Sequence, residues 1–577
     1  MRTKTAALVI SAVMAGLGGW LGALVKEEPK GAATTPPAEA KEKPAAVAAA
    51  PASTGADEIP NLVPADAWQL TWARGAVLYE IFVRSFADSN GDGVGDLAGL
   101  TAKLDYLNDG DPKSLGDLGL DALWLMPIFE SPSYHGYDVT NYEKIQPAYG
   151  TEQDVAKLIA AAHQRGMKVI LDLPINHTST ANAWFKESDA STTSPKRDWY
   201  VWRNDDPHWT TPWGNGNPTW HAGKHGFYYG VFLGGMPDLN LRTPAVRTEV
   251  ARIAKFWLDR GVDGFRLDAA RHLIENGDGD DQVDTPETHA FLKELSAALR
   301  KANPAALLVG ENWTDAAHIA KYYGSTAALG GGDELPMNFD FPLSTAILAS
   351  VKAGEPSAIN AALDLKTKVY PKGVLDGTFL TNHDMIRIAT ELTNDPARLK
   401  LAAAILLTLP GTPFVYYGEE LGLQNGPGGQ DEWKRTPMPW DATPGGGFTM
   451  AKPWHDPAPG REMANVAVET GDPNSLLSNY RLLIRARHRS NSLRYGTMEK
   501  VKPPGQPAAV LSYILRYEGA HSLVVHNLSG LEVEAGPFYL GARFDPLYVS
   551  PGVPPPAGGK AGSKIKLPPY SSGVWKF

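Results

Sequence analysis

Residues 151–177 read TEQDVAKLIAAAHQRGMKVILDLPINH, and the order of elements in this stretch decides the fold. The first four residues have the pattern of a helix capping box. Apolar side chains then recur at helical spacing until Gly166, a residue suited to end a helix. Residues 168–173 follow as a buried strand, and Asp172 lies close to its end. The stretch therefore predicts a helix that leads directly into a strand carrying an acid.

The same order of helix, glycine, strand and acid recurs along the chain. Residues 250–258 predict an amphipathic helix, and the strand over residues 262–267 leads to Asp268. Similar segments bring the predicted strands to eight, at residues 77–83, 122–126, 168–173, 262–267, 307–310, 337–341, 378–381 and 413–417. Eight strands separated by helices predict an α/β fold, the (β/α)8 TIM barrel.

The interval after the third predicted strand and the C-terminal region do not follow this pattern. Residues 178–241 are rich in glycine and aromatic residues, and we expect them to form a subdomain inserted after strand 3. Residues 495–577 contain alternating apolar residues around a turn at Gly519, which predicts a hairpin within a C-terminal antiparallel β-sandwich. The barrel is accordingly assigned to residues 59–494, with the insertion inside it.

The first 58 residues differ in composition from the rest of the chain. Residues 1–25 combine a basic start, at Arg2 and Lys4, with an uncharged apolar stretch, which is typical of a signal peptide. The apolar stretch also has the ~20 residues that cross a bilayer, so a membrane anchor is the alternative. Residues 26–58 are rich in Ala, Pro, Lys and Glu and predict a solvated linker. We therefore expect an exported protein, periplasmic or extracellular, with or without a membrane tether.

Composition excludes several classes of protein. The 577 residues carry 54 Lys+Arg and 64 Asp+Glu, and the net charge of −10 argues against nucleic-acid binding. The chain has no cysteine, so disulfides, thiolate nucleophiles and cysteine-ligated metal centres are excluded. Its 43% hydrophobic and 20% charged residues are typical of a globular protein.

Charged and polar side chains gather at the predicted strand ends. The acids are Asp172, Asp268, Glu311 and Asp384, and Asn176, His177, Arg266 and His383 accompany them. The C-terminal ends of barrel strands meet at one mouth, so these side chains are expected to converge. Glycoside hydrolysis needs one carboxylate to attack the anomeric carbon and a second, protonated, for the leaving oxygen. An arginine beside an acid keeps that carboxylate aimed. The set therefore predicts a glycosidase.

Four motifs identify a family. The chain resembles glycoside hydrolase family 13, the α-amylase family, from about Trp68 to the C-terminus. The matching motifs, in the family's order, are DLPINH at 172–177, GFRLD at 264–268, GENW at 310–313 and LTNHD at 380–384. The resemblance implies a retaining mechanism, with Asp268 as nucleophile, Glu311 as general acid/base and Asp384 as stabiliser of the transition state.

The resemblance also implies residues that bind the substrate. Arg266 would orient the nucleophile, and His177 and His383 would contact the sugar at the reacting bond. Tyr137 and Asp138, in HGYDV at 135–139, match the family's stacking tyrosine and its structural neighbour. The implied partner is an α-glucan or maltooligosaccharide.

Residues 88–96 read DSNGDGVGD and place oxygen-bearing residues at alternate positions. This pattern resembles the first part of an EF-hand loop, where side chains at positions 1, 3, 5 and 9 and a carbonyl at position 7 bind calcium. Gly99 stands where an EF-hand has its glutamate, so a signalling EF-hand is not expected. The loop predicts a Ca²⁺ cofactor held by Asp88, Asn90, Asp92, Val94 and Asp96. The resemblance implies a second site from Asn176, Asp238 and the carbonyl of His272.

Substrate preference rests on weaker signals. MPDLN at 236–240 resembles a variant intermediate between the oligo-1,6-glucosidase and neopullulanase groups of the family. RTPMPWD at 435–441 resembles the oligo-1,6-glucosidase side, although Pro439 replaces its usual glutamine. Ala269 follows the predicted nucleophile, where α-1,6-acting relatives usually carry valine, and export favours a large polymer as substrate. These features favour an α-amylase that cleaves α-1,4 bonds of starch.

Three alternatives remain open on the sequence. The first is an exo-acting α-glucosidase or oligo-1,6-glucosidase, and the second is a cyclomaltodextrinase or neopullulanase. The third and most remote is a non-catalytic, membrane-anchored subunit of a transporter, which is disfavoured because Asp268, Glu311 and Asp384 are all present. The oligomeric state is left undetermined by the sequence.

Overall fold

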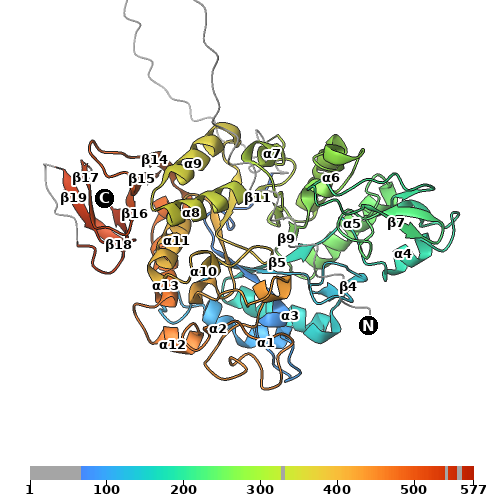
Figure 1. Cartoon of the computed structure of the whole chain (residues 1–577), viewed down its shortest axis with the longest axis horizontal. Helices are drawn as coiled ribbons and strands as arrows, with labels where there is room; N and C mark the ends of the chain where they lie inside the picture. The colour runs from blue at the N-terminus through green and yellow to red at the C-terminus, as the bar shows by residue number, and fades with distance from the viewer. Residues whose placement is uncertain (1–66, 326–331, 540–543, 555–561) are drawn as a thin grey trace, which may run out of the picture.

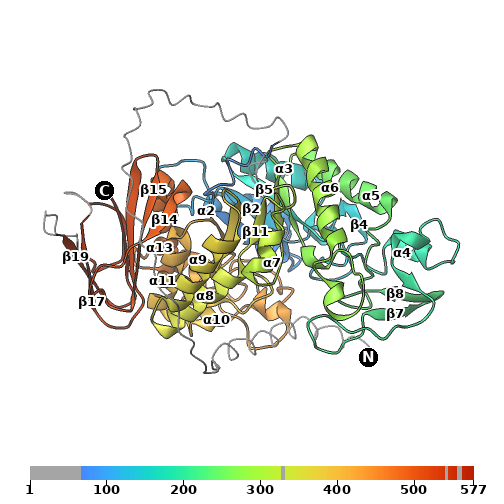
Figure 2. The same ribbon diagram turned by 90° about the horizontal axis from the view of Figure 1, so that it is seen from above.

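The computed structural model of the chain describes residues 67–325, 332–539, 544–554 and 562–577. The predicted signal or anchor at residues 1–25 and the linker at 26–58 lie outside the described residues and stay predictions. Within the described ranges, no helix is both long and apolar enough to cross a bilayer. Figures 1 and 2 show a central barrel, with the C-terminal sheets at one end and a small inserted unit around α4 and β7 at the other.

Eight parallel strands close into the barrel at the centre of the molecule. They are β1 (Leu78–Ile81), β2 (Ala122–Leu125), β5 (Lys168–Leu173), β9 (Gly264–Leu267), β10 (Leu307–Gly310), β11 (Met337–Phe339), β12 (Leu375–Phe379) and β13 (Thr412–Tyr416). The strands pair in chain order, and β13 pairs with β1 to complete the ring. The predicted TIM barrel is confirmed.

Six of the eight strands begin or end at other residues than predicted, and only β5 and β10 match their predicted ranges. The strand predicted at 337–341 ends at Phe339, because Asp340 caps the next helix and its side chain accepts a hydrogen bond from the Leu343 amide. The strand predicted at 378–381 runs from Leu375 to Phe379 instead. Asp384 consequently lies on the loop that follows this strand rather than directly at its end.

Helices follow the strands and cover the outside of the barrel. They are α1 (Leu97–Ala102), α2 (Leu104–Leu107), α3 (Glu152–Gln164), α5 (Pro244–Leu258), α6 (Pro286–Ala302), α7 (Ala316–Lys321), α8 (Phe341–Ala353), α9 (Ser357–Val369), α10 (Ile388–Glu391), α11 (Pro396–Thr408), α12 (Val466–Thr470), α13 (Leu476–His488) and α14 (Asn491–Tyr495). The capping box predicted for α3 is present, with Thr151 and Asp154 exchanging side-chain-to-backbone hydrogen bonds. Local sequence therefore sets where this helix begins.

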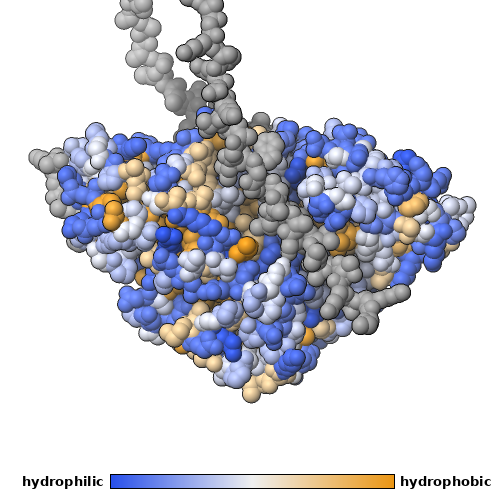
Figure 3. All heavy atoms as spheres, in the orientation of Figure 1, coloured by the Kyte–Doolittle hydropathy of each residue, from blue (hydrophilic) through white to orange (hydrophobic). Residues whose placement is uncertain are grey.

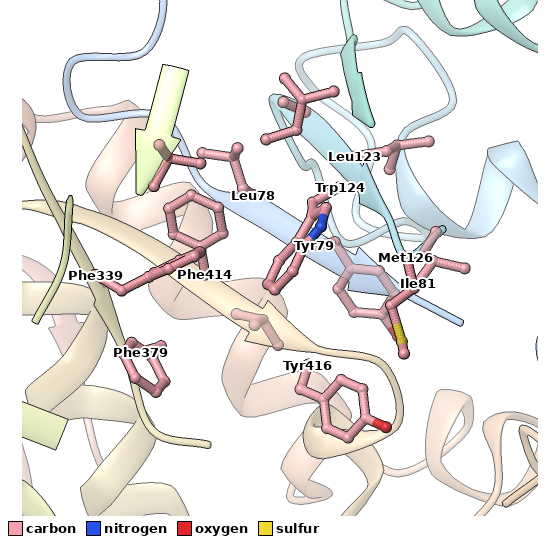
Figure 4. Packing of buried hydrophobic residues seen from close by; sticks show 14 of the residues in the cluster. Leu78, Tyr79, Ile81, Leu123, Trp124, Met126, Phe339, Phe379, Phe414 and Tyr416 are labelled. Carbon is pink, nitrogen blue, oxygen red and sulfur yellow. The ribbon is translucent and has the colours of Figure 1, made fainter. Parts of the chain in front are cut away.

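Aromatic side chains fill the interior of the barrel (Figure 4). The ring centroid of Phe339 lies 5.3 Å from that of Trp124 and 4.8 Å from that of Phe414. Trp124 also meets the edge of His383, with 5.8 Å between ring centroids. The packed interior thus reaches up to a residue of the predicted site and supports it from below.

Two small sheets interrupt the barrel pattern. The first, β3 (Phe129–Glu130) with β4 (Asn141–Ile145), follows β2 and was not predicted. The second lies in the predicted insertion and contains β6 (Trp202–Arg203), β7 (Trp220–Gly223) and β8 (Gly226–Tyr229), with α4 (Ala183–Ser188) before it. An isolated β-bridge between His177 and Asp238 joins the end of the insertion to the segment that follows β5.

The C-terminal region is the predicted antiparallel sandwich. Its larger sheet is formed by β14 (Thr497–Lys500), β15 (Val510–Tyr517), β16 (Ala520–Asn527), β20 (Ser572–Lys576) and β18 (Asp545–Val549), and its smaller sheet by β17 (Val533–Phe538) and β19 (Ser563–Leu567). Buried side chains of both sheets form one hydrophobic cluster that includes Ile514, Phe538 and Trp575. The larger sheet also contacts the barrel, where the hydroxyls of Thr408 and Tyr513 lie 2.8 Å apart.

The surface is polar over most of the face seen in Figure 3, where hydrophobic residues appear in small separate groups. The main hydrophobic cluster runs from the barrel into the C-terminal sheet and includes both Trp124 and Val574. Barrel and sandwich therefore share a continuous apolar contact in the interior.

Candidate active site

A cleft opens where the barrel strands end. The space within it is about 840 Å³, a figure that includes open solvent at its mouth. Its lining residues are His135, Tyr137, His177, Trp213, Phe232, Leu233, Met236, Asp268, Ala269, Glu311, Trp313, Asp384 and Arg435. The three predicted catalytic acids therefore face one space, because parallel strands deliver their C-terminal ends to the same side.

A single buried arginine lies behind the cleft and contacts three acids. One Nη atom of Arg266, on β9, lies 2.8 Å from Oδ1 of Asp172 and 2.6 Å from Oδ1 of Asp268. Its other Nη atom lies 2.7 Å from Oε2 of Glu311. The side chain of Arg266 is only 1% exposed. Charge-assisted contacts of this kind fix both the separation and the orientation of the acids.

Glu311, which lines the cleft, is suited to carry a proton. Burial raises the pKa of Glu311 to about 7. The charge of Arg266 lowers it, and the charges of Asp268 and Asp384 raise it. Oε2 of Glu311 also accepts a hydrogen bond from the Ala269 amide at 3.0 Å. A carboxyl group with this pKa can donate a proton near neutral pH and take it back later.

Ala269 has a backbone conformation that L-residues rarely adopt. Its φ is +49°, in the left-handed region, although it is not glycine. This sharp turn directs the Ala269 amide at the side chain of Glu311, and the next amide, of Ala270, donates to the Glu311 carbonyl at 3.1 Å. Strain of this kind is found where the surrounding structure demands it. Here the strained turn directly after Asp268, the predicted nucleophile, supplies two hydrogen bonds to Glu311, the predicted acid.

Asp384 is held by two cations. Nη2 of Arg435 lies 2.8 Å from its Oδ1, and Nε2 of His383 lies 3.1 Å from its Oδ2. Burial alone would raise the pKa of Asp384, but the charges of His383 and Arg435 bring it well below its usual range. Asp384 therefore offers ionised oxygens to the cleft.

Tyr137 and His177 also line the cleft. The Tyr137 hydroxyl donates to Oδ2 of Asp172 at 2.9 Å, and its ring stacks on His383 at 5.6 Å between centroids. Burial lowers the pKa of His177, so the ring is neutral. Its Nε2 atom has no hydrogen-bond partner within the described part of the chain, which leaves it able to bind a hydroxyl group.

Asp138 does not line the cleft. Its Oδ1 accepts a hydrogen bond from the Ser131 hydroxyl at 2.7 Å and another from the Ser133 hydroxyl. These contacts close the loop between β3 and β4, which carries Tyr137. The structure thus places Asp138 as a support for the wall of the cleft.

Comparison with known proteins identifies the family. The family description "Alpha amylase, catalytic domain" matches residues 80–496. Alpha-amylase 3 of Dictyoglomus thermophilum is 41% identical over 467 residues, which cover 80% of this chain and 86% of that protein. The chain belongs to the α-amylase family.

Other members of this family show how widely its named activities vary. A trehalose synthase/amylase of Mycolicibacterium smegmatis is 35% identical over 494 residues, covering 77% of this chain and 80% of that protein. The crystal structure of an alpha-amylase from H. orenii superposes with a TM-score of 0.78 and 38% identity, covering 87% of this chain and 99% of that chain. This α-amylase-family protein is therefore a glycoside hydrolase or transglycosylase acting on α-glucosidic bonds.

The cleft also contains residues that were not predicted from the ends of the barrel strands. Trp213 stacks on Phe232 with 5.6 Å between ring centroids, and both come from the insertion. Trp313 stacks on Phe341 at 4.6 Å. Trp313 and Arg435 belong to motifs visible in the sequence, whereas Phe232 has no such signal because the insertion lacks a regular apolar period.

The side-chain oxygens of the predicted calcium loop accept hydrogen bonds from the loop's own backbone amides. Oδ1 of Asp88 accepts from the Gly91 amide at 2.7 Å, and Oδ1 of Asn90 accepts from the Asp92 amide at 2.9 Å. Oδ1 of Asp92 accepts from the Val94 amide at 2.8 Å. These turns form a compact loop of carboxylate, amide and carbonyl oxygens, which are the ligands that Ca²⁺ prefers.

Both side-chain oxygens of Asp96 accept hydrogen bonds. Its Oδ1 caps α1 through the Gly99 amide at 2.6 Å, and its Oδ2 accepts from the Ser89 amide at 2.9 Å. Asp88 is engaged in the same way, since its Oδ2 accepts from the Gly93 amide at 2.9 Å and from the Thr449 hydroxyl. The calcium site over the five predicted ligands stays a prediction. No group of three or more His, Asp or Glu side chains in the described ranges converges as a metal site. A Ca²⁺ ion in this loop would therefore also need the side-chain oxygen of Asn90 and the backbone carbonyl of Val94 as ligands.

The second predicted calcium site has a different character. Nδ2 of Asn176 donates to Oδ2 of Asp238 at 3.0 Å, and the Val231 amide donates to its Oδ1 at 3.1 Å. Burial raises the pKa of Asp238 well above its usual value, and these two hydrogen bonds oppose the rise. The carboxyl of Asp238 thus has neutral donors on both oxygens, and the site stays a prediction.

Proposed function

We propose that the protein is a retaining α-amylase that cleaves α-1,4-glucosidic bonds of starch and maltooligosaccharides. The observation that carries the proposal is the buried guanidinium of Arg266, which contacts the carboxyl groups of both Asp268 and Glu311. Retaining enzymes hold these groups ~5–5.5 Å apart, whereas inverting enzymes leave ~6.5–9.5 Å for a water molecule. Two carboxyls on one guanidinium fit the closer spacing.

The chemistry follows from the two environments. The carboxylate of Asp268 attacks the anomeric carbon while Glu311 gives its proton to the glycosidic oxygen, so the C–O bond breaks and a β-glycosyl-enzyme forms. Glu311, now ionised, takes a proton from a water molecule. The resulting hydroxide attacks the anomeric carbon, Asp268 leaves, and the product keeps the α configuration.

The remaining wall residues would bind the reacting sugar. Asp384 is positioned to accept hydrogen bonds from sugar hydroxyls, and such bonds strengthen as the oxocarbenium character develops. Tyr137 offers the face of its ring for stacking, and the stacked pairs formed by Trp213 and by Trp313 offer further flat apolar surface.

Two observations support cleavage of α-1,4 bonds in a polymer. Ala269 occupies the position after the nucleophile where α-1,6-acting relatives usually have valine, and one relative is named an alpha-amylase at 41% identity. The second candidate is an exo-acting α-glucosidase. It is favoured by Arg435, which comes from the motif of the oligo-1,6-glucosidase type and binds Asp384.

Chromatography of the products from soluble starch over time tests the proposal. An α-amylase gives mixed short maltooligosaccharides early, together with rapid loss of iodine staining. Glucose alone, with starch nearly untouched and maltose or isomaltose consumed, would contradict it in favour of the α-glucosidase. Asp268→Asn protein, produced and purified by the same procedure, controls for contaminating amylase.

We propose in addition that the enzyme acts outside the cytoplasm. The support is the apolar segment over residues 1–25 and the linker over 26–58, which together suit export and display. Fractionation of cells that produce the full chain tests this. Activity confined to the cytoplasmic fraction would refute it.

A further inference from the structure

A buried acid on the first barrel strand lies directly behind the cleft. Glu80, on β1, is only 2% exposed and does not line the cleft. Its Oε1 lies 2.5 Å from Nδ1 of His383, a distance typical of a charge-assisted hydrogen bond. The His383 ring is also enclosed by Trp124 and Tyr137, whose centroids lie 5.8 and 5.6 Å away. The contact therefore forms in an apolar, enclosed place.

Both ring nitrogens of His383 face hydrogen-bond acceptors. Nδ1 faces Glu80, and Nε2 lies 3.1 Å from Oδ2 of Asp384 and 2.7 Å from the Tyr137 oxygen. The Tyr137 hydroxyl already donates to Asp172, so its oxygen can only accept from His383. A neutral imidazole would present a lone pair to one of these oxygens, and only the doubly protonated ring donates on both sides.

Some charges around the His383 ring favour its protonated form and others oppose it. Arg435 donates to the backbone carbonyl of His383 at 3.1 Å, and Arg266 lies 3.4 Å from the Tyr137 hydroxyl. These cations oppose a charged histidine, as does burial. The charges of Asp384 and Glu80 outweigh burial and raise the pKa of His383 to about 9.

We propose that Glu80 is a positioning residue that keeps His383 protonated and thereby holds Asp384 in the orientation that binds the reacting sugar. The proposal rests on the function proposed above for Asp384. Glu80 touches neither the cleft nor the reacting atoms, so it acts only through His383. Without its charge, His383 would lose its proton more readily and present a lone pair to Asp384 or Tyr137.

Glu80→Gln tests this, because glutamine keeps the shape and can still accept a hydrogen bond from Nδ1. NMR of the full chain labelled with ¹⁵N-histidine follows the titration of His383, one of 14 histidines, identified by its absence in His383→Asn. The wild-type ring should stay protonated up to about pH 9. In Glu80→Gln its pKa should fall by at least about one unit, as expected on removal of an opposite charge at this distance.

Activity should follow the same titration. Above the new pKa of His383, kcat of Glu80→Gln on maltooligosaccharides should be at least about tenfold lower than that of the wild type at the same pH, with little change in KM. The reason is that Asp384 is expected to bind the transition state more strongly than the substrate. Near pH 5.5, where His383 is protonated in both proteins, kcat should return to within about twofold of the wild type. Recovery at low pH separates loss of the proton from general damage to the fold.

Glu420→Gln is the matched control. Glu420 is completely buried and accepts hydrogen bonds from the hydroxyls of Tyr79 and Tyr106 at 2.7 and 2.6 Å, so its replacement disturbs the same region without touching His383. The titration of His383 in this variant should match the wild type. Should the control and Glu80→Gln shift it equally, Glu80 has no specific role.

Other results would also overturn the proposal. One is a wild-type His383 that is neutral at pH 7, which needs no variant to detect. Another is an unchanged His383 titration in Glu80→Gln, and a third is a loss of kcat that is equal at every pH. A wild-type enzyme without activity on any α-glucan would refute the proposed function, while the NMR titration would still decide whether Glu80 keeps His383 protonated.

Discussion

Replacing Glu311 with glutamine should remove the alkaline limb of the pH profile of kcat/KM. Burial raises the pKa of Glu311 to about 7, against the charge of Arg266. A group with this pKa is about nine-tenths protonated at pH 6 and about one-tenth protonated at pH 8. Because the acid form is the active one in the first step, wild-type kcat/KM should fall about tenfold between these pH values. Glutamine cannot donate the proton, so at pH 6 kcat/KM should be lower by about 10²–10⁴-fold.

Initial rates on maltooligosaccharides from about pH 5 to about pH 9 measure this effect. Glu469→Gln is the control, because burial raises the pKa of Glu469 to about 8 as well, but its carboxyl binds the Leu477 amide, outside the cleft. Its pH profile should match the wild type. A wild-type kcat/KM that is flat between pH 6 and pH 8 would refute the reasoning, and so would the same slope in Glu311→Gln.

Asp268→Asn should lower turnover of starch by at least about 10⁴-fold while circular dichroism shows an intact fold, and wild-type activity would exclude the assigned nucleophile. Treatment with EDTA should lower the melting temperature, and Asp92→Ala should abolish this response; an unchanged melting curve would count against a calcium loop. Gly93→Ala should destabilise the protein by about 2–4 kcal/mol, because its Cβ would lie 2.1 Å from the Lys452 carbonyl oxygen at a φ of +92°. Gly91→Ala, with φ +80° but nothing within 4 Å, should cost only about 1 kcal/mol, and equal melting temperatures would disprove the packing argument.

Most of the barrel could be predicted because each strand is buried on both faces. Such strands appear as short continuous apolar runs between amphipathic helices, as the segment containing Asp172 illustrates. Strand ends were predicted less well, since the end of β11 depends on whether the Asp340 side chain caps the next helix. The β3–β4 hairpin was missed because its two strands are short and carry no alternating apolar pattern.

The candidate site could be predicted only in part. Asp268 and Glu311 directly follow apolar strands, so barrel geometry alone brings them to one mouth. Arg435 was noticed only as part of a motif, and nothing in the sequence showed that it would bind Asp384. Phe232 lies in an irregular insertion, where spacing along the chain does not indicate which side chains will meet.

The sequence by itself determined the barrel, the sandwich and the acids at or near the strand ends, because apolar periodicity and capping act between residues that are close in the chain. Only the tertiary structure decided which charges face one another. Glu80 and His383 are 303 residues apart in the chain, yet their side chains meet because β13 pairs with β1 and closes the ring. Protonation in the cleft depends on distances of a few ångströms between buried charges, and the folded barrel sets those distances.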